Sequence, residues 1–454
     1  MRRCLQQHIW LGVVLATAVA LSAALVGVAL SATKGTSLQA PDSSDYLQLA
    51  RSLRDTGSLD PLGTSVFRTP GYPILLAGAR WAGDALGRAS GGVALLLLVQ
   101  QSLLAWVTYR LGRQFFPRGT ATAAAALLVV SPAVLASSVR VLSDTPFAIL
   151  LTASLWLMVR HLHTGRWKHL LAAAALLAAG CYVRPVGLVM ALLYVAVLVV
   201  RRGRLARTAA FVALLVTLLA PWVVRNGTRA GYWGFSSNFP TTLYVYSAPL
   251  TLEAAEGLPA SQARHQVTRR ALQRAGALAE DPTLGEWIAA QQATAAEVIA
   301  QYPGTYAAIH LRGALAFWLP GGTDVLEVAG ATRGQRGTLA VLREGGLTAA
   351  VKHYFDGNAV AAVAAGGTAL LHGLIVLGAV VAACAGLRHP GRIPAGVWLM
   401  AAMLLTAFLL GGPVTTPRFR VPLQPVLCLA AAAGWGHLWR YFRRRRLDAA
   451  ARSR

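Results

Sequence analysis

Acidic residues and lysines are scarce in this sequence of 454 residues. Asp and Glu number 17 against 42 Lys and Arg, which gives a formal net charge of +25. Only 13% of the residues are charged, whereas a soluble domain usually carries about 25%. This shortage of charge, together with 56% hydrophobic residues, argues against a soluble multidomain enzyme, a disordered chain or a fibrous protein. The excess of arginine first suggests a nucleic-acid binder, so the location of the charges decides its meaning.

Cysteines are also few, and no two of them lie close together in the sequence. Three of the four, Cys181, Cys384 and Cys428, fall inside apolar blocks. The sequence therefore predicts neither a disulfide framework nor a site with Cys/His metal-ligand spacing.

Long apolar blocks dominate what is present. A helix needs about 20 apolar residues to cross the hydrocarbon core of a membrane. The first block follows the short basic segment Met1–His8; it is too long for a signal peptide, so we expect an uncleaved first helix. Ten candidate spans follow from the pattern, at about 9–31, 92–112, 119–138, 145–162, 169–183, 185–200, 208–224, 361–387, 394–411 and 423–440.

The basic residues fix the orientation of these spans. With a cytoplasmic N-terminus, every inner connection and the tail from Arg440 onward are rich in Arg or Lys, as the positive-inside rule requires. Under this topology all acidic residues except Asp448 lie outside. We therefore expect a multi-pass protein of the plasma (inner) membrane with both termini cytoplasmic. The positive charge then serves orientation and contact with anionic lipid, and nucleic acid is not an expected partner.

Two outer segments, 32–90 and 225–360, are long. The second contains helical stretches at Ser261–Leu278 and Glu286–Ala300, which predict a helical cap on the membrane. The expected fold class is an all-α polytopic membrane protein. Its expected parts are an N-terminal transmembrane module at 1–224 that includes the first outer loop, a large extracytoplasmic loop at 225–360, and C-terminal helices with a basic tail at 361–454.

The first outer loop carries the richest pattern. Tyr46, Leu49, Ala50 and Leu53 recur at helical spacing after Asp42 and Asp45, which predicts an amphipathic helix on the outer membrane surface. Gly57 is placed to end this helix. The segment Phe67–Pro73, with two prolines and a glycine, predicts a rigid turn.

This arrangement resembles the first extracytoplasmic loop of the GT-C membrane glycosyltransferases. The likeness lies in the pattern Asp-x-x-x-Tyr-x-x-x-Ala-Arg from Asp42, followed by a glycine and by a basic residue near Pro-x-Tyr-Pro. It is nearest to the bacterial branch around aminoarabinose transferases and protein mannosyltransferases. The further segments that agree are 143–147, 184–185, 221–226 and 418–425, so the resemblance covers about 9–440.

The resemblance implies an activity and its partners. Such enzymes move a sugar from a polyprenyl-phosphate-linked donor to an acceptor with inversion at the anomeric carbon, and the acceptor here is a lipid, a glycan or a protein. A carboxylate that removes the acceptor's proton suits this chemistry, and arginines suit the phosphate that leaves.

The resemblance also assigns the candidate site residues. Asp42 matches the catalytic aspartate, with a helix N-cap as the alternative role, and Asp45 is the second candidate base. Arg68 matches the basic residue that contacts the donor phosphate, and Arg225 is the second candidate for it. Two groups complete the set: the weaker phosphate candidates Arg184, Arg418 and Arg420, whose alternative role is contact with lipid headgroups, and the substrate-binding candidates Tyr46, Tyr72 and Asp144.

No metal ligand or cofactor is assigned. Oligosaccharyltransferase-like relatives use an acidic pair in the second outer loop to hold a divalent metal, whereas this chain has Asp144 alone there. A divalent metal needs several oxygen ligands, so a single acid in this loop argues against metal dependence, and a divalent metal stays an alternative.

Two other functions stay open from the sequence. A transporter or flippase of lipid-linked sugars would show charges within its spans or inverted repeats, and the spans are nearly free of acids. A glycan ligase or polymerase of another class would also combine many spans with a large outer loop. The aspartate pattern of the first loop favours the transferase.

Overall fold

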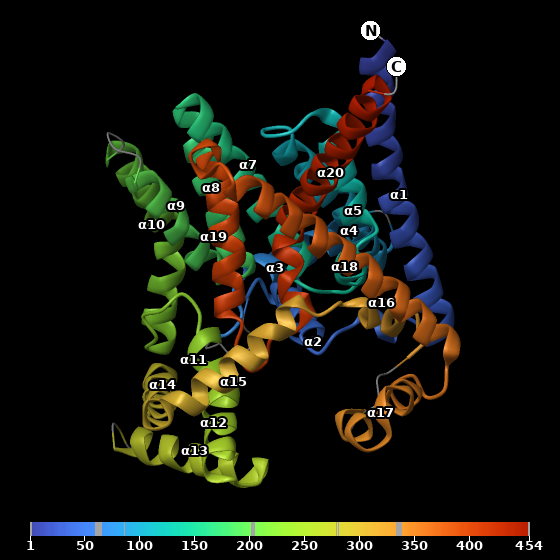
Figure 1. Ribbon diagram of the computed structural model, residues 1–454. Coiled ribbons are helices and arrows are strands. Elements are labelled where there is room, and N and C mark those ends of the chain that lie inside the picture. The colour runs from blue at the N-terminus through green and yellow to red at the C-terminus, as the bar shows by residue number, and fades with distance from the viewer. Residues whose placement is uncertain are drawn as a thin grey trace.

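The computed structural model describes residues 2–59, 66–85, 87–200, 205–277, 279, 281–332 and 338–452. Within these ranges the regular elements are all helical and no strand occurs. The chain has an all-α membrane-protein fold, as the sequence predicted (Figure 1).

Each of the ten apolar blocks forms a helix or a bent helix pair. Among the described residues six helices are long and apolar enough to cross a membrane, and α5 with α6 makes a seventh if the bent pair counts as one span. The three remaining blocks form apolar helices of 14 to 17 residues, so the number of spans stays a prediction. The helices are α1 (Arg2–Thr33), α4 (Ala89–Gly112), α5 (Arg118–Val129), α6 (Pro132–Val139), α7 (Asp144–Thr164), α8 (Trp167–Val183), α9 (Gly187–Val200), α10 (Leu205–Ala230), α18 (Ala359–Leu387), α19 (Ala395–Leu410) and α20 (Gln424–Arg452).

The block expected at 119–138 as one straight span is bent. Its two helices meet at 61° where Ser131 precedes Pro132. Proline lacks the N–H that would continue the hydrogen-bond ladder of α5, and it disfavours helical dihedrals at the residue before it. The bend therefore has a local cause in the sequence.

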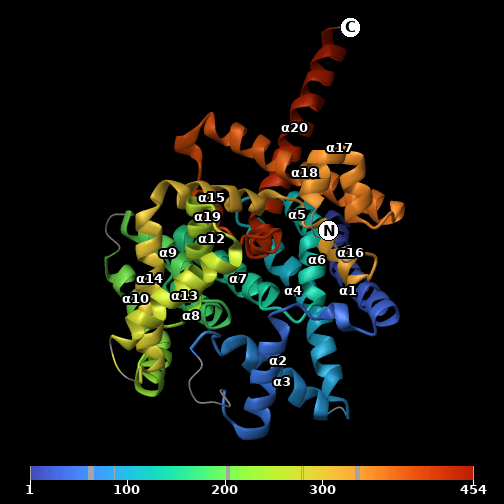
Figure 2. The same ribbon diagram turned by 90° about the horizontal axis from the view of Figure 1, so that it is seen from below.

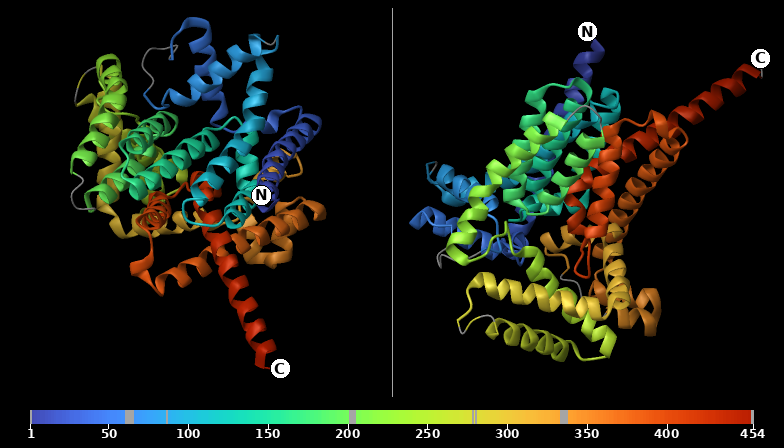
Figure 3. Two further views of the ribbon diagram at one scale, coloured as in Figure 1. Left: turned by 90° about the horizontal axis from the view of Figure 1, so that it is seen from above. Right: turned by 90° about the vertical axis from the view of Figure 1, so that its left-hand side faces the viewer.

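Both chain ends lie at one end of the helix bundle, which we call the termini end; the opposite end is the loop end (Figure 1). The helices α11–α15 and α17 gather at or beyond the loop end, and the last part of α20 extends away from the other helices (Figure 3). The helices that are not in the apolar blocks are α2 (Ser43–Thr56), α3 (Gly71–Ala85), α11 (Asn238–Thr242), α12 (Ala248–Glu256), α13 (Ala260–Gly276), α14 (Leu284–Gln301), α15 (Pro303–Leu315), α16 (Gly322–Val328) and α17 (Thr338–Tyr354).

The two helical stretches predicted within 225–360 are confirmed as α13 and α14. Along α13 a buried residue recurs every four positions, which faces one side of the helix onto α12 and α14. Thr283 and Glu286 form a capping box that starts α14. That these helices cap the membrane, and that the chain divides at 224 and 360, remain predictions.

The amphipathic helix of the first loop is also confirmed, as α2. It buries Tyr46 and Ala50 and ends at Gly57, whose φ of +70° is a left-handed conformation that glycine adopts without strain. Seen from the loop end, α2 and α3 lie side by side at the edge of the bundle (Figure 2). The start of α2 therefore reaches the end of the bundle where α7 begins and α8 ends.

Candidate functional site

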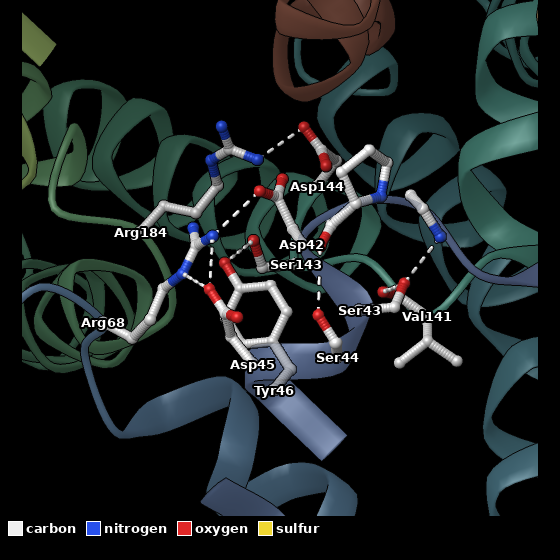
Figure 4. A network of polar contacts seen from close by, with 12 residues as sticks. Asp42, Ser43, Ser44, Asp45, Tyr46, Arg68, Val141, Ser143, Asp144 and Arg184 are labelled. Atoms are coloured by element: carbon white, nitrogen blue, oxygen red, sulfur yellow. Dashed lines mark hydrogen bonds and ion pairs between the residues drawn. The ribbon is translucent and has the colours of Figure 1, made fainter. Parts of the chain in front are cut away.

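Three carboxylates and three arginines form one continuous network at the loop end. Arg68 binds both acids of the first loop: its Nη2 lies 2.8 Å from Oδ1 of Asp42 and 3.0 Å from Oδ2 of Asp45. At the other side of the network, Nη1 of Arg184 lies 2.5 Å from Oδ1 of Asp144. Figure 4 shows these two groups of contacts side by side, with their residues coming from separate segments of the chain.

Arg418 joins the two groups. Its Nη2 lies 2.6 Å from Oδ2 of Asp42, and its Nε lies 2.8 Å from Oδ2 of Asp144. Arg418 belongs to the short 3-10 helix η5 (Pro417–Leu423), which precedes α20. The order Asp45–Arg68–Asp42–Arg418–Asp144–Arg184 alternates in sign, so the six charges balance.

The start of α2 is fixed against the segment before α7. Oγ of Ser43 donates to the carbonyl of Val141 at 2.7 Å and accepts from the backbone N–H of Ala40 at 2.8 Å (Figure 4). The hydroxyls of Tyr46 and Ser143 lie 3.0 Å apart, one turn further along α2. These bonds set Asp42 beside Asp144 although the two are about 100 positions apart in the sequence.

Asp42 occupies the N-cap position of α2 but does not act as its cap. Its side chain makes no capping hydrogen bond, because both carboxylate oxygens accept from arginines. The alternative role as an N-cap is therefore wrong in this structure.

A glycine lets the Arg68 segment reach the Arg184 segment. A Cβ on Gly71, at the start of α3, would lie 2.6 Å from the carbonyl carbon and 2.7 Å from the carbonyl oxygen of Tyr182, in the last turn of α8. Only the absence of a side chain permits this approach of two backbones. Arg68 lies three residues before the contact and Arg184 two residues after it, so the approach brings both into one site.

Four residues of the network, Asp42, Arg68, Arg184 and Arg418, line a hollow of about 100 Å³. A water needs about 15 Å³ measured in the same way, so the hollow has room for several waters or part of a ligand. The lining combines charged residues with neutral ones from the connection between α8 and α9 and from the start of α11. The lining residues are Asp42, Tyr46, Phe67, Arg68, Thr69, Val183, Arg184, Pro185, Val186, Asn238 and Arg418.

The arginines set the protonation state of Asp42. Burial by itself would raise the pKa of this carboxyl, but Arg418 and then Arg68 outweigh burial and hold the pKa below its ordinary value of 3.8. Asp42 is therefore ionised, and its side chain is 29% exposed. Asp144 is 0% exposed, and Asp45 is about half exposed.

Tyr46 lines the hollow, whereas Tyr72 does not. Tyr72 is fully buried and its ring packs edge-on against Tyr46 with 4.9 Å between centroids. Burial raises the pKa of the Tyr72 hydroxyl above its ordinary value. The prediction that Tyr72 contacts substrate is therefore corrected: its ring packs against the ring of Tyr46.

Two of the predicted phosphate-binding arginines lie outside the network. Arg420 is 1% exposed and donates to the carbonyls of Phe317 and Leu319 and to Oε1 of Gln424. Its guanidinium is thus occupied in holding the segment after α15 against η5, and we no longer assign it to the phosphate.

Arg225 lies near the end of α10, where its guanidinium contacts Oδ1 of Asn226 at 3.0 Å and stacks on Trp222. It does not line the hollow. The structure therefore brings together Arg68, Arg184 and Arg418, and it ranks the two weaker sequence candidates above Arg225.

The described part of the chain holds no group of three His, Cys, Asp or Glu residues that could bind a metal ion.

Three residues of the site were missed by the sequence analysis. Ser143 and Gly71 were noted only within longer segments, and Asn238 was not singled out. Their roles depend on contacts between distant segments, and no spacing within the sequence signals such contacts. A glycine directly after Thr-Pro was the one local sign of a close approach.

One family model matches this chain, that of the dolichyl-phosphate-mannose-protein mannosyltransferases, over residues 73–224. The matched segment includes Asp144 and Arg184 but begins after Asp42 and Arg68. Among curated proteins none matches this sequence.

Solved structures with a similar fold include an oligosaccharyltransferase, AglB, from Archaeoglobus fulgidus. One, in complex with an inhibitory peptide and a dolichol-phosphate, matches with a TM-score of 0.51 and 15% identity over 97% of this chain and 52% of that one. Another, tethered to an acceptor peptide, matches with a TM-score of 0.52 and 15% identity over 95% and 50% of the two chains. A structure of ArnT from Cupriavidus metallidurans, bound to undecaprenyl phosphate, gives a TM-score of 0.39 and 14% identity over 92% and 76%.

The chain thus spans about half the length of the oligosaccharyltransferase, and the likeness concerns the fold. The family-model match over α3–α10 comes from the sequence and is therefore independent of the similarity in fold. The chain is thus similar to the dolichyl-phosphate-mannose-protein mannosyltransferases over residues 73–224, and its fold is similar to that of the oligosaccharyltransferase.

Proposed function

We propose that the protein transfers a sugar from a polyprenyl-phosphate-linked donor to an acceptor on the outer side of the membrane, with Asp42 as the general base. The observation that carries the proposal is the position of Asp42 between Arg68 and Arg418 at the hollow. A carboxylate beside several arginines combines a proton acceptor with groups that stabilise a leaving phosphate.

Arg68, Arg184 and Arg418 are the proposed phosphate ligands. All three line the hollow, and their side chains are between 15% and 22% exposed, so a ligand can reach them. Arginine binds phosphate through paired N–H donors in a fixed plane, which orients the leaving group as well as attracting it.

The ion pairs give donor binding a second consequence. The N–H donors that would hold a phosphate are engaged by Asp42, Asp45 and Asp144 in the structure. A bound phosphate competes for these donors and adds negative charge beside Asp42. Both effects raise the pKa of Asp42 from its depressed value, so donor binding turns a weakly basic carboxylate into a better proton acceptor.

The proposed reaction is a single displacement. An acceptor hydroxyl or amine attacks the anomeric carbon, and the bond from that carbon to the phosphate oxygen breaks with its electron pair leaving on the phosphate. The acceptor's proton passes to Asp42. Attack opposite the leaving group inverts the anomeric configuration, as the family resemblance implies.

Asp144 and Asp45 have different proposed parts. Asp144 is fully buried and touches Arg184 and Arg418, so it positions these arginines and does not reach an acceptor. Asp45 does not line the hollow and is half exposed, which makes it a weaker base candidate than Asp42.

The topology supports an outer location for the site. The network lies at the loop end, and the basic segments that the positive-inside rule assigns to the cytoplasm, including Arg443–Arg446, lie toward the termini end (Figure 1). The network also stands at helix ends and not in the middle of spans, which favours an enzyme over a transporter of lipid-linked sugars.

The fold supports a lipid-linked donor and leaves the acceptor class open. The similar oligosaccharyltransferase was captured with dolichol-phosphate and a peptide. For this chain a lipid, a glycan and a protein all remain acceptor candidates, and membrane lipids surround the spans.

Deleting the gene and comparing envelope glycans by mass spectrometry tests the proposal. We expect one sugar modification to disappear, to return with the wild-type gene, and to stay absent with Asp42→Asn expressed at the same level. An unchanged glycan profile in the deletion strain, or full restoration by the variant, would contradict it.

A further inference from the structure

The segment 234–238, at the beginning of the loop-end helices, is held tightly from the side of α10. Nε1 of Trp222 donates to the carbonyl of Phe235 at 3.0 Å. Nδ2 of Asn226, which is fully buried, donates to the carbonyl of Gly234 at 2.9 Å. The end of α10 therefore fixes the backbone of this segment.

The same segment is held from the side of Arg68. The backbone N–H of Ser237 donates to the carbonyl of Val66 at 3.0 Å, and Oγ of Ser236 donates to the carbonyl of Phe67 at 2.8 Å. These carbonyls directly precede Arg68 in the chain. The segment thus has a set position relative to the proposed phosphate-binding arginine.

Asn238 follows these anchors and lines the hollow. Its backbone N–H donates to Oγ of Ser236 at 3.2 Å, but its side-chain amide makes no hydrogen bond among the residues that the structure describes. It is half-buried, in a place whose backbone is rigid on both sides. A side chain presented in this way has its donor and acceptor free for a ligand.

Two kinds of residue line the hollow. Asp42, Arg68, Arg184 and Arg418 are charged, while Asn238, Pro185 and Val186 are neutral. A carboxamide offers one carbonyl acceptor and two N–H donors, which suits hydroxyl groups because each hydroxyl both donates and accepts. Apolar side chains beside an amide suit the C–H faces between hydroxyls. The neutral residues of the lining therefore suit a sugar ring, and its arginines suit the phosphate.

We infer that Asn238 hydrogen-bonds a hydroxyl of the transferred sugar and takes part in selecting the donor sugar. The inference rests on the proposed function, because it needs a sugar-phosphate donor in the hollow. It assigns the beginning of the large loop, which carried no recognisable motif, to sugar recognition.

Binding measurements on the purified full-length protein test the inference. The probes are undecaprenyl phosphate without a sugar and undecaprenyl phosphate carrying mannose, glucose, galactose or arabinose. For wild type, we expect at least one sugar-bearing lipid to bind more tightly than the bare carrier. Asn238→Ala should weaken binding of that lipid about 3- to 10-fold, since one neutral hydrogen bond contributes about 0.5–1.5 kcal/mol. Binding of the bare carrier should change less than about twofold on the same scale.

Phe239→Ala is the matched control. Phe239 is the next residue of the same short helix, is 64% exposed and does not line the hollow, so its loss should leave both affinities unchanged. Thermal unfolding of both variants checks that the fold is retained.

The outcomes separate the two proposals. If Asn238→Ala weakened the bare carrier and the sugar-bearing lipid equally, or weakened neither, the inference would be overturned while the proposed function stood. If the wild-type protein bound no polyprenyl phosphate of either kind, the proposed function would fail and the inference with it.

Discussion

Replacing Arg418 with methionine removes the guanidinium that Asp42 and Asp144 share, while keeping an unbranched side chain of similar length. Two ion pairs, at 2.6 and 2.8 Å, are lost at once. Among the described residues, Asp144, which is 0% exposed, then keeps its ion pair with Arg184, and Asp42 keeps its ion pair with Arg68. The substitution therefore weakens the network at its centre.

The expected loss follows from the burial of the partners. Removing one member of a buried ion pair costs about 3–5 kcal/mol. Solvent reaches 22% of Arg418 and 29% of Asp42, which lowers the cost, so the lower limit of about 3 kcal/mol is appropriate. At about 2 °C per kcal/mol the apparent Tm falls by roughly 6 °C.

Thermal unfolding in detergent at one fixed scan rate measures this loss, and a double-mutant cycle identifies its source. Asp144→Asn removes the buried charge that Arg418→Met leaves under-compensated. The loss of unfolding free energy in the double variant should therefore be smaller, by about 1–3 kcal/mol, than the sum of the two single losses. Donor binding should also weaken in Arg418→Met, because one of three phosphate ligands is gone. An unchanged Tm, or strictly additive losses in the cycle, would refute the reasoning that Arg418 holds the two acids together.

Three further results are expected. Gly71→Ala should lower the free energy of unfolding by about 1–3 kcal/mol and weaken donor binding, because the new Cβ meets backbone at 2.6 Å. The control Gly78→Ala, in the same helix, adds a Cβ that meets nothing within 4 Å and should be neutral or slightly stabilising. Equal effects of the two substitutions in thermal unfolding would contradict this expectation. Asp45→Asn should reduce turnover less than about tenfold, since this acid is half exposed and its ion pair is with Arg68. A loss as large as that for Asp42→Asn would reverse the order of the two base candidates. Because the pKa of Asp42 is depressed in the folded protein, its ionised form stabilises the fold above the ordinary pKa, and this contribution disappears as the pH falls through the folded pKa. The Tm difference between wild type and Asp42→Asn should therefore stay constant from about pH 5 to 8 and shrink only below about pH 4. A decline between pH 5 and 7 would count against the ion pairs.

The helices were predictable because apolar blocks of sufficient length have few other structures available in a membrane. The start and end of α2 were also encoded locally, by acids before an apolar stripe and by Gly57 after it. The bend between α5 and α6 is signalled by Pro132, but the sequence reading treated the block as one span.

The pairing of the site residues was not predictable in the same way. Asp42 and Arg418 are 376 positions apart, and their contact depends on where η5 lies after the chain has passed through all the intervening helices. Arg418 and Arg420 look alike in the sequence, since both are arginines within two residues of a proline at a span start. In the folded protein one enters the hollow and the other turns to backbone carbonyls of the segment after α15.

The N-cap position of Asp42 illustrates how tertiary contacts override a local preference. An aspartate directly before a helix usually accepts from the backbone N–H groups of the first turn. Here two guanidinium groups supply stronger, charge-assisted hydrogen bonds, and the side chain turns to them. A local rule therefore located the residue correctly and misjudged its partners.

The central claim is that Asp42 takes the acceptor's proton while arginines hold the donor. The most direct test is to measure donor binding and sugar transfer separately for Asp42→Asn, with the donor and acceptor identified from the deletion strain. We expect donor affinity equal to or higher than that of wild type, since the amide no longer competes with phosphate for Arg68 and Arg418, together with a loss of transfer of at least about a hundredfold. Wild-type turnover in this variant, or loss of donor binding in a protein that remains folded, would contradict the account.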